Sequence, residues 1–198
     1  MSGEQYFHAN PSAASNEKVI HAELRGRDWS FITDSGVFSK QTVDFGTATL
    51  LETFEWPEVD GDIIDIGCGY GVVGVTLAKE TTRSVLLFDI NQRAVELANK
   101  NIQRCQADNA KAAESDLFSA YKGRAAAILT NPPIRAGKKV VHRLFEEAYE
   151  ALSPGGECWV VIQKKQGAPS AKEKLNELFP VVKNVKKNKG YYIFRACK

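Results

Sequence analysis

From residue 60 onwards, short apolar runs alternate with segments whose apolar residues recur at helical spacing. Runs such as 62–66 (DIIDI) have the length of buried strands, whereas 91–105 places Ala94, Leu97 and Ile102 on one helical face, with Asn91 as a plausible N-cap. Strands are expected at 62–66, 84–90, 110–118, 125–133 and 156–164, and helices at 71–80, 91–105, 139–152 and 169–179. Segment 181–197 reads as two strands around the Lys-Asn-Lys-Gly turn at 187–190.

This alternation predicts a Rossmann-like α/β fold. Its seven-stranded, mostly parallel sheet carries helices on both faces and ends in an antiparallel C-terminal hairpin, because a tight turn joins only antiparallel strands. Ahead of it, residues 18–36 alternate polar and apolar positions around Arg25-Gly26, which indicates a small β-hairpin, and 47–54 reads as a short helix. We expect residues 1–58 to form an extension packed on a main domain of residues 59–198, effectively one domain.

Composition excludes several classes of protein. Hydrophobic residues make up 43% and charged residues 25% of the 198, as in globular proteins. No apolar run approaches the roughly 18 residues of a membrane helix, and the N-terminus lacks the basic and apolar regions of a secretory signal. The four cysteines have no metal-binding spacing, which favours reduced thiols and no metal site. A cytoplasmic protein is therefore expected.

Charge is distributed unevenly along the chain. Residues 1–120 hold 18 acidic and 10 basic residues, a net charge of −8, whereas residues 121–198 hold 6 acidic and 16 basic residues, a net charge of +10. This asymmetry suits a polyanionic partner, although a solvated, lysine-rich surface explains it equally well.

The loop 65–71 (DIGCGYG) joins the first strand of the main domain to a helix. Gly67, Gly69 and Gly71 permit a tight turn and close approach of a ligand, and the free N–H groups of the helix point at the loop. A dinucleotide fingerprint, G-x-G-x-x-G, fits only when counted from Gly69, which ignores Asp65. That carboxylate would repel a pyrophosphate and attract a cation. S-adenosylmethionine, with its amino group and sulfonium, suits the loop better.

Carboxylates also stand at the ends of the next two strands. Asp89 can accept hydrogen bonds from both ribose hydroxyls. Asp116 could accept from the adenine amino group, with Leu117 against the ring, or could be a helix N-cap. Both lie at carboxyl ends of strands, where open α/β sheets bind ligands.

The fourth strand ends in an unusual segment, Asn131-Pro132-Pro133. A residue before proline is held extended, so the turn is stiff, and its carbonyls and the Asn131 side-chain oxygen can accept from an incoming amine. Two such acceptors would orient an exocyclic nitrogen toward a methyl group and stabilise its developing positive charge. The alternative is a proline-capped strand end with no chemical role.

From residue 62 the chain resembles class I S-adenosylmethionine-dependent methyltransferases. The loop 65–71, Asp89 and 131–134 match the motifs of that superfamily in order and spacing. More narrowly, 36–54 and 131–138 (NPPIRAGK) resemble the small methyltransferase domain of enzymes that modify guanine N2 in small-subunit ribosomal RNA. The resemblance makes 59–198 the catalytic domain.

The resemblance also implies roles for individual residues. Catalytic residues would be Asn131, Pro132, Pro133 and Ile134. Cofactor-binding residues would be Asp44, Gly46, Asp65, Gly67, Cys68, Gly69, Gly71, Asp89, Ile90, Asp116, Leu117 and Asn131. Phe38, Arg135, Lys138 and Lys139 would bind substrate.

Two features leave the substrate open. Enzymes that act on amino groups often have an aromatic residue at the position of Ile134, to stack on the base. Phe38 or Tyr70 could compensate, although Phe38 could equally be core. The cluster Lys183, Lys186, Lys187 and Lys189 could contact phosphates or could protect a sheet edge from aggregation.

The expected function is methyl transfer from S-adenosylmethionine to guanine N2 in ribosomal RNA, with RNA or the small ribosomal subunit as partner and no membrane association. A methyltransferase of protein glutamine amides and a non-catalytic module that binds RNA or a nucleotide are the alternatives.

Overall fold

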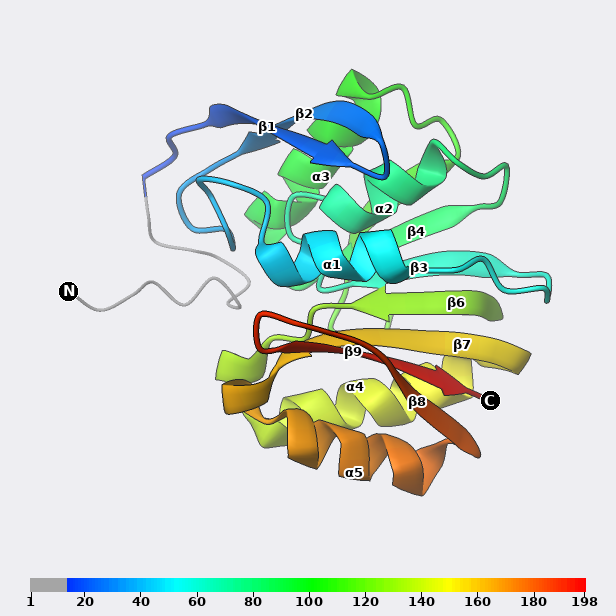
Figure 1. Ribbon diagram of the computed structural model, residues 1–198. Coiled ribbons are helices and arrows are strands. Elements are labelled where there is room, and N and C mark those ends of the chain that lie inside the picture. Colours follow the sequence, from blue (N-terminus) through cyan, green and yellow to red (C-terminus); the bar gives the residue numbers. More distant parts are fainter. Residues whose placement is uncertain (1–13) are drawn as a thin grey trace.

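The computed structural model describes residues 14–198, and residues 1–13, which belong to the predicted extension, lie outside the described part. Seven strands form one sheet in the order β5-β4-β3-β6-β7-β9-β8 (Figure 1). Their bounds are β3 Asp62–Ile66, β4 Val85–Asp89, β5 Ala110–Glu114, β6 Ala125–Thr130, β7 Leu152–Gln163, β8 Val181–Asn188 and β9 Tyr191–Cys197. This is the Rossmann-like sheet that the alternating pattern predicts.

Most neighbouring strands are parallel, and the exception is the C-terminal pair. β3 pairs with both β4 and β6, so the first and fourth predicted strands are adjacent. β9 inserts between β7 and β8 and runs antiparallel to both, as the tight turn at Lys189-Gly190 requires. The predicted antiparallel C-terminal hairpin is therefore confirmed.

Helices cover both faces of the sheet. Helices α1 Phe45–Thr53, α2 Val72–Ala78 and α3 Gln92–Arg104 lie on one face, and α4 Lys138–Ala151 and α5 Ala168–Leu178 lie on the other (Figure 1). Two 3-10 turns, η1 Ile134–Ala136 and η2 Lys164–Gln166, precede α4 and α5. Each face buries its own apolar cluster. Among residues 14–198, no helix has the length and apolar character to cross a membrane.

The predicted N-terminal hairpin consists of β1 Lys18–Leu24 and β2 Arg27–Thr33, which form a separate two-stranded sheet. Leu24, Trp29 and Phe31 from this hairpin belong to the same buried cluster as side chains of α1, α2 and α3. Arg25 at the turn forms an ion pair with Glu80 and donates to the Leu51 carbonyl at the end of α1. The hairpin thus packs on the helical layer, while a boundary at residue 58 stays a prediction.

Candidate functional site

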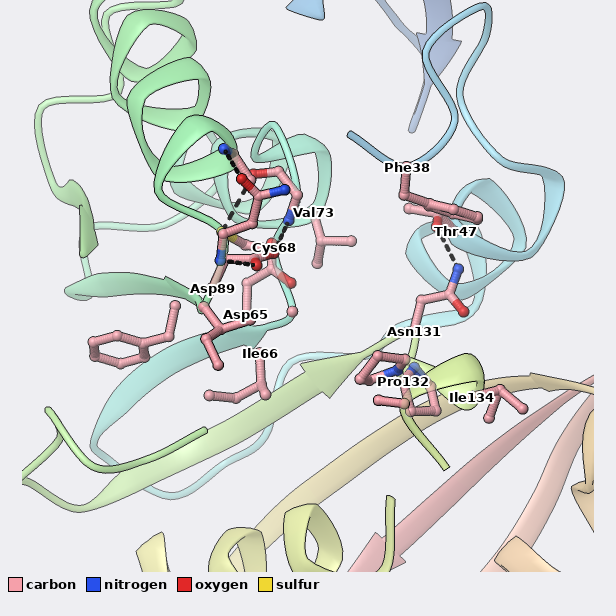
Figure 2. Close-up of a pocket in the computed structure, with 18 of the residues that line it drawn as sticks. Phe38, Thr47, Asp65, Ile66, Cys68, Val73, Asp89, Asn131, Pro132 and Ile134 are labelled. Carbon is pink, nitrogen blue, oxygen red and sulfur yellow. Dashed lines mark hydrogen bonds between the residues drawn. The ribbon is translucent and has the colours of Figure 1, made fainter. Parts of the chain in front are cut away.

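The carboxyl ends of β3, β4, β5 and β6 border one cavity of about 610 Å³. Figure 2 shows Asp65, Cys68 and Asp89 on one side of it and Asn131, Pro132 and Ile134 on the other, with Phe38 and Thr47 above Asn131. These residues come from distant parts of the chain, and the parallel sheet brings them together because its strands end at one edge.

Most of the predicted site residues line this cavity. They are Phe38, Asp44, Asp65, Gly67, Cys68, Gly69, Asp89, Ile90, Asp116, Leu117, Asn131, Pro132, Pro133, Ile134, Arg135 and Lys139. Three do not: Gly46, Gly71 and Lys138. Gly71 instead allows close packing of α2, because a Cβ there would come within 3.2 Å of Ala98 and Leu87. Lys138 borders a separate shallow depression with Pro169 and Glu173.

Asp65 caps the helix that follows the glycine loop. The N-cap residue of α2, Gly71, has no side chain, and Asp65 Oδ2 accepts from the N–H of Gly74 at 2.9 Å instead. The carboxyl group is almost wholly buried. Burial, and to a lesser degree the negative charge of Asp89, raise its pKa to about 7 although the Gly74 hydrogen bond opposes this. A cation in the cavity would therefore stabilise the ionised form.

The glycine loop itself approaches the cavity closely. Gly67 and Gly69 have φ angles of 71° and 56°, and a Cβ at either position would meet no atom within 4 Å. Their backbone thus faces open space rather than packed side chains. Together with the buried Asp65, this cradle fits S-adenosylmethionine, whose amino group and sulfonium are positively charged.

Asp89 is positioned by backbone N–H groups. Its Oδ2 accepts from Gly69 at 2.8 Å and its Oδ1 from Asn91 at 2.9 Å. Burial raises its pKa, and these hydrogen bonds act in the opposite direction. Each carboxylate oxygen keeps a second lone pair, so the predicted contacts with ribose hydroxyls are compatible with this geometry.

Asp116 lies after β5, not within it, because the strand ends at Glu114. No helix starts at Asp116, so the interpretation as an N-cap is wrong; the Ser115 hydroxyl accepts from the Ala120 N–H and donates to the Leu117 carbonyl. This turn holds Leu117 at a φ of 50°, and its side chain lines the cavity. Asp116 forms an exposed ion pair with Arg143, which is weak enough to exchange for another donor.

The Asn-Pro-Pro segment forms the stiff turn that the prolines predict. Pro133 has φ −74° and ψ 76°, and the Ile134 N–H donates to the Pro132 carbonyl at 2.8 Å, as in an inverse γ-turn. One lone pair of the Pro132 carbonyl is therefore already used. Asn131 Nδ2 donates to Asp44 Oδ2 at 3.1 Å and to Thr47 Oγ1 at 3.0 Å, which leaves its Oδ1 available to accept.

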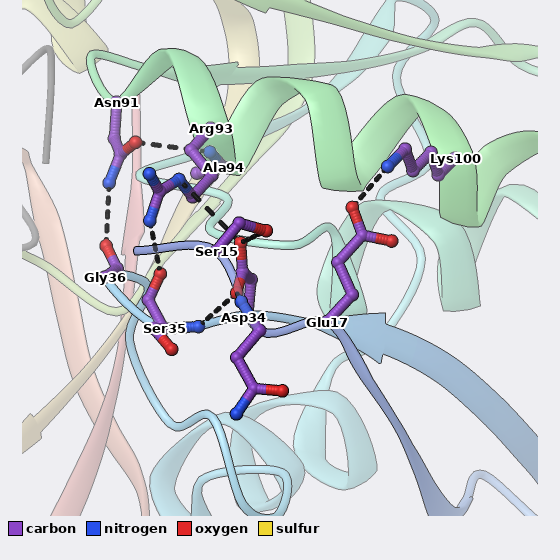
Figure 3. Close-up of polar contacts among 10 residues, drawn as sticks. Ser15, Glu17, Asp34, Ser35, Gly36, Asn91, Arg93, Ala94 and Lys100 are labelled. Carbon is purple, nitrogen blue, oxygen red and sulfur yellow. Dashed lines mark hydrogen bonds and ion pairs between the residues drawn. The ribbon is translucent and has the colours of Figure 1, made fainter. Parts of the chain in front are cut away.

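The segment that carries Phe38 is anchored to α3 through Asp34. Figure 3 shows the carboxylate of Asp34 accepting from Ser15 and Ser35 and facing Arg93, which also donates to the Ser35 carbonyl. Burial alone would raise the pKa of Asp34, but hydrogen bonds from Asn16, Ser15 and Ser35 lower it overall. The ionised carboxylate thus holds this segment in place.

Phe38 and Tyr70, the two aromatic residues that could stack on a base, differ in the exposure of their side chains. Phe38 is 38% exposed and lines the cavity, so it is not a core residue. Tyr70 is buried, with its ring against Phe31 and its hydroxyl 3.4 Å from the Ser39 carbonyl. Phe38 is therefore the better candidate for an aromatic contact with substrate.

Among the cavity residues that sequence reasoning missed, Thr47 and Tyr191 matter most for the site. Thr47 could have been found, because it stands three positions after Asp44 as expected for the partner of an N-cap. Tyr191 follows the last turn and has no comparable signal. Its ring lies against Gly46, where a Cβ would come within 2.6 Å of two ring carbons. Gly46 thus serves the packing of Tyr191 rather than the cavity surface.

Within residues 14–198, no group of three or more His, Cys, Asp or Glu side chains could hold a metal ion. The thiol of Cys68 is buried in the cavity wall, and burial, with the nearby Asp89 and Asp65, raises its pKa well above the usual value. A neutral thiol is a poor nucleophile, so the chemistry must come from other groups.

Comparison with known proteins places this chain in a family. The methyltransferase small domain family matches residues 28–195. The uncharacterized protein YbxB of Bacillus subtilis is 53% identical over 198 residues, 98% of each chain. Ribosomal RNA small subunit methyltransferase C of Haemophilus influenzae (strain 86-028NP) is 34% identical over 140 residues, which are 68% of this chain and 42% of that protein.

A solved structure shares the fold over nearly the whole chain. The Thermus thermophilus 16S rRNA N2 G1207 methyltransferase (RsmC), in complex with AdoMet and guanosine, superposes with a TM-score of 0.82 and 27% identity over 95% of this chain. The chain spans about half the length of that enzyme, 52%. By sequence and by fold, the chain belongs to the methyltransferase small domain family and is an S-adenosylmethionine-dependent methyltransferase.

Proposed function

We propose that this enzyme methylates an exocyclic amino group of RNA, with guanine N2 in small-subunit ribosomal RNA as its target. The observation that carries the proposal is the orientation of Asn131, whose amide nitrogen is held by Asp44 and Thr47 and whose oxygen remains free to accept from an amine. The relatives that act on ribosomal RNA supply the class of substrate. Such an activity would place the enzyme in the cytoplasm.

The residues around Asn131 perform two tasks in this reaction. Asn131 Oδ1 and a backbone carbonyl of the stiff turn accept the two amine hydrogens, which directs the nitrogen lone pair toward the cofactor side of the cavity. The same oxygens stabilise the positive charge that develops on nitrogen. S-adenosylmethionine, when bound, would supply the electrophilic methyl group, with S-adenosylhomocysteine as the leaving group and product. The methylated nitrogen then loses a proton to water, so no strong base is needed among the residues of the cavity.

The rest of the cavity suits a planar base. Phe38 offers an exposed ring, while Pro132 and Ile134 supply an apolar wall on the other side of Asn131 (Figure 2). Aromatic rings stack on any base, and an apolar wall excludes water without selecting one. We infer that Phe38 substitutes for the aromatic residue that the position of Ile134 lacks.

Basic side chains stand beside the cavity. Arg135 and Lys139 line it, and exposed lysines follow at position 187, near the end of β8, and at position 189, in the β8–β9 turn. Lys187 and Lys189 lie over the rings of Tyr192 and Phe45 at 5.3 and 4.9 Å from the ring centroids. Residues 178–198 contain no acidic residue that could neutralise them. Such a surface fits the phosphates that flank a target nucleotide.

Transfer of tritium from labelled S-adenosylmethionine tests the proposal. Small ribosomal subunits, their extracted RNA and their proteins, all from cells that lack this gene, are offered separately. We expect label in RNA, and in N2-methylguanosine after digestion to nucleosides. The Asn131→Ala enzyme should bind the cofactor but lose about 100-fold or more in rate, because the acceptor of the amine is gone. Label confined to protein, or to another nucleoside, would contradict the proposal.

A further inference from the structure

We propose that Asp44 is a positioning residue: with Thr47 it fixes the side-chain amide of Asn131 in the one orientation that allows methyl transfer to an amine. Asp44 comes from the start of α1, and Asn131 follows β6, 87 positions later. The proposal rests on the proposed function in one respect, since it takes the group that receives the methyl to be an amine.

An amide side chain can be turned by 180° with little change in shape, so its neighbours decide where its oxygen points. Both neighbours of Asn131 on this side are acceptors. The carboxylate of Asp44 has no hydrogen to donate. The hydroxyl of Thr47 lies 3.4 Å from the same carboxylate oxygen and can direct its own hydrogen there, so it presents a lone pair to Asn131. Only the NH2 group can face this pair.

The oxygen of Asn131 is consequently turned away from Thr47, as Figure 2 shows. The reversed amide would place an oxygen against a carboxylate and would offer hydrogens to an amine that also brings hydrogens. Hydrogen bonds from the NH2 group to an ionised partner also polarise the amide and make its oxygen a stronger acceptor. Asp44 therefore acts on the reaction through Asn131.

A third contact keeps Asp44 in place. The ring of Tyr191 covers the first turn of α1, where Gly46 leaves room for it. Burial, and then the charge of Asp44 and a hydrogen bond to it, raise the pKa of the Tyr191 hydroxyl. That hydroxyl therefore stays protonated and can donate to the side chain of Asp44. The carboxylate also accepts from the Thr47 N–H at 2.9 Å as the N-cap of α1.

Three variants separate positioning from capping. Asp44→Asn keeps an oxygen that can accept from both Thr47 N–H and Asn131, while it loses the charge and replaces the other carboxylate oxygen by an NH2 group. Asp44→Ser keeps the cap, because serine is a good N-cap, but is too short to reach Asn131. Asp44→Ser combined with Thr47→Val removes both acceptors of the Asn131 NH2 group. The serine hydroxyl still caps α1, because it can accept from the backbone N–H of residue 47.

We expect kcat with the extracted small-subunit RNA to stay within about fivefold of wild type in Asp44→Asn and to fall about 10- to 100-fold in the double variant. The dissociation constant for S-adenosylmethionine and the melting temperature should change little in all three variants. Equal rates in all of them would show that Asp44 is only a helix cap. A weakened affinity for the cofactor in Asp44→Asn would instead make Asp44 a cofactor contact, and either result overturns the proposal.

A second measurement does not depend on the substrate. The side-chain NH2 of Asn131, assigned in nitrogen-15 NMR spectra by its loss in Asn131→Ala, should exchange its hydrogens slowly in wild type and Asp44→Asn and rapidly in the double variant. Similar exchange in all three would contradict the orientation proposed here. If wild type labelled no RNA at all, the proposed function would fail, and this exchange pattern would still decide the inference about Asp44.

Discussion

At the scale of single residues, the proposed cofactor site contains a carboxyl group that is hard to ionise. Asp65 is buried, and its pKa is raised to about 7 by burial, with a smaller contribution from Asp89. Near neutral pH a part of the molecules therefore carries a neutral Asp65. A positively charged cofactor favours the ionised form, so binding must release a proton from the molecules in which Asp65 is neutral.

This coupling predicts a pH dependence of cofactor affinity. Between about pH 6 and pH 8 the affinity for S-adenosylmethionine should rise, because less work is needed to ionise Asp65 as the pH passes its pKa. Calorimetry in buffers of different ionisation enthalpy should detect proton release at pH 6.5. Asp65→Asn should bind more weakly and lose the dependence, whereas Asp108→Asn, at an exposed position, should behave as wild type. An affinity of the wild type that is flat across this range would contradict the coupling.

The same group predicts an unusual effect on stability. In the unfolded chain Asp65 ionises near pH 3.8, but in the folded protein only near pH 7. Between these pH values the folded state holds a proton on Asp65 that the unfolded state has lost. The contribution of Asp65 to stability is therefore full below pH 3.8 and is lost as pH rises through 7. The contribution of Asp65 to the free energy of unfolding therefore differs between low and high pH by at most about 4 kcal/mol.

Asp65→Asn should therefore raise the free energy of unfolding of the cofactor-free protein at pH 8, by up to a few kcal/mol, and give little gain at pH 4. The asparagine oxygen can still accept from the Gly74 N–H. Urea denaturation at the two pH values measures the change. A variant that is less stable than wild type at pH 8 would show that the carboxylate is stabilised in the folded state instead.

How far the sequence predicts the site depends on the separation of the residues. Asp65, Asp89 and Asn131 could be placed together because each lies at the carboxyl end of a strand, and parallel strands bring these ends to one edge. The partners of Asn131 could not, since Asp44 and Thr47 lie 87 and 84 positions away on a helix whose packing no local pattern fixes. The same holds for Tyr191, which reaches the cavity only because β9 inserts beside β7.

At the scale of elements, the segment between β2 and α1 depends on one carboxylate. Asp34 accepts from Ser15 and Ser35 and faces Arg93 of α3 (Figure 3). Asp34→Ala should destabilise the protein by about 1–3 kcal/mol, because the hydrogen bonds to its buried carboxylate are lost. Phe38, four positions further on, should then lose its fixed place, which raises KM for RNA more than it lowers kcat. Urea denaturation and steady-state kinetics measure the two effects.

The pKa of Asp34 is lowered, so its contribution to stability is present above the ordinary pKa of aspartate and is lost as pH falls through its folded value. The difference in free energy of unfolding between wild type and Asp34→Ala should therefore become smaller below about pH 4. Hydrogen exchange of the backbone N–H groups at 34–39 should accelerate in the variant. Unchanged exchange there would contradict the anchoring role.

Element boundaries were predictable where periodicity was strong and less so where backbone irregularities intervene. The predicted helix at 91–105 and its Asn91 cap match α3, with Asn91 accepting from the Ala94 N–H. β7 begins at Leu152, not at residue 156, because Ser153-Pro154-Gly155-Gly156 continue the strand instead of forming a loop. There the register between β6 and β7 shifts, and Gly155 has a φ of 78°, neither of which a hydrophobic pattern reveals.

At the scale of the whole molecule, the unequal charges of the two halves of the chain correspond to two parts of the fold. The acidic half forms the hairpin, α1 to α3 and the strands up to β5, whereas the basic half forms β6 to β9, α4 and α5. The cavity lies where the two parts meet, since it is lined by residues of both. An anionic substrate would therefore be attracted to one side of the cavity, and a cationic cofactor group to the other.

Substitution of Lys187 and Lys189 tests whether the basic part of the fold attracts an anionic substrate. If both contact phosphates, Lys187→Gln combined with Lys189→Gln should weaken binding of small-subunit RNA and reduce the slope of log affinity against log salt concentration by about 1.5. The affinity for S-adenosylmethionine should not change. Lys111→Gln combined with Lys122→Gln is the matched control, because Lys111 lies on the opposite edge strand, β5, and Lys122 precedes β6 at the end of the sheet away from the cavity.

The alternative role of these lysines gives a different result. Residues 181–188 form an edge strand, and lysines on an edge discourage pairing between sheets of two molecules. If that were their only function, the double variant at 187 and 189 would bind RNA with wild-type affinity and salt dependence but would aggregate at lower protein concentration. Filter binding at four salt concentrations, together with light scattering of the free protein, separates the two roles because phosphate contacts affect only the first measurement.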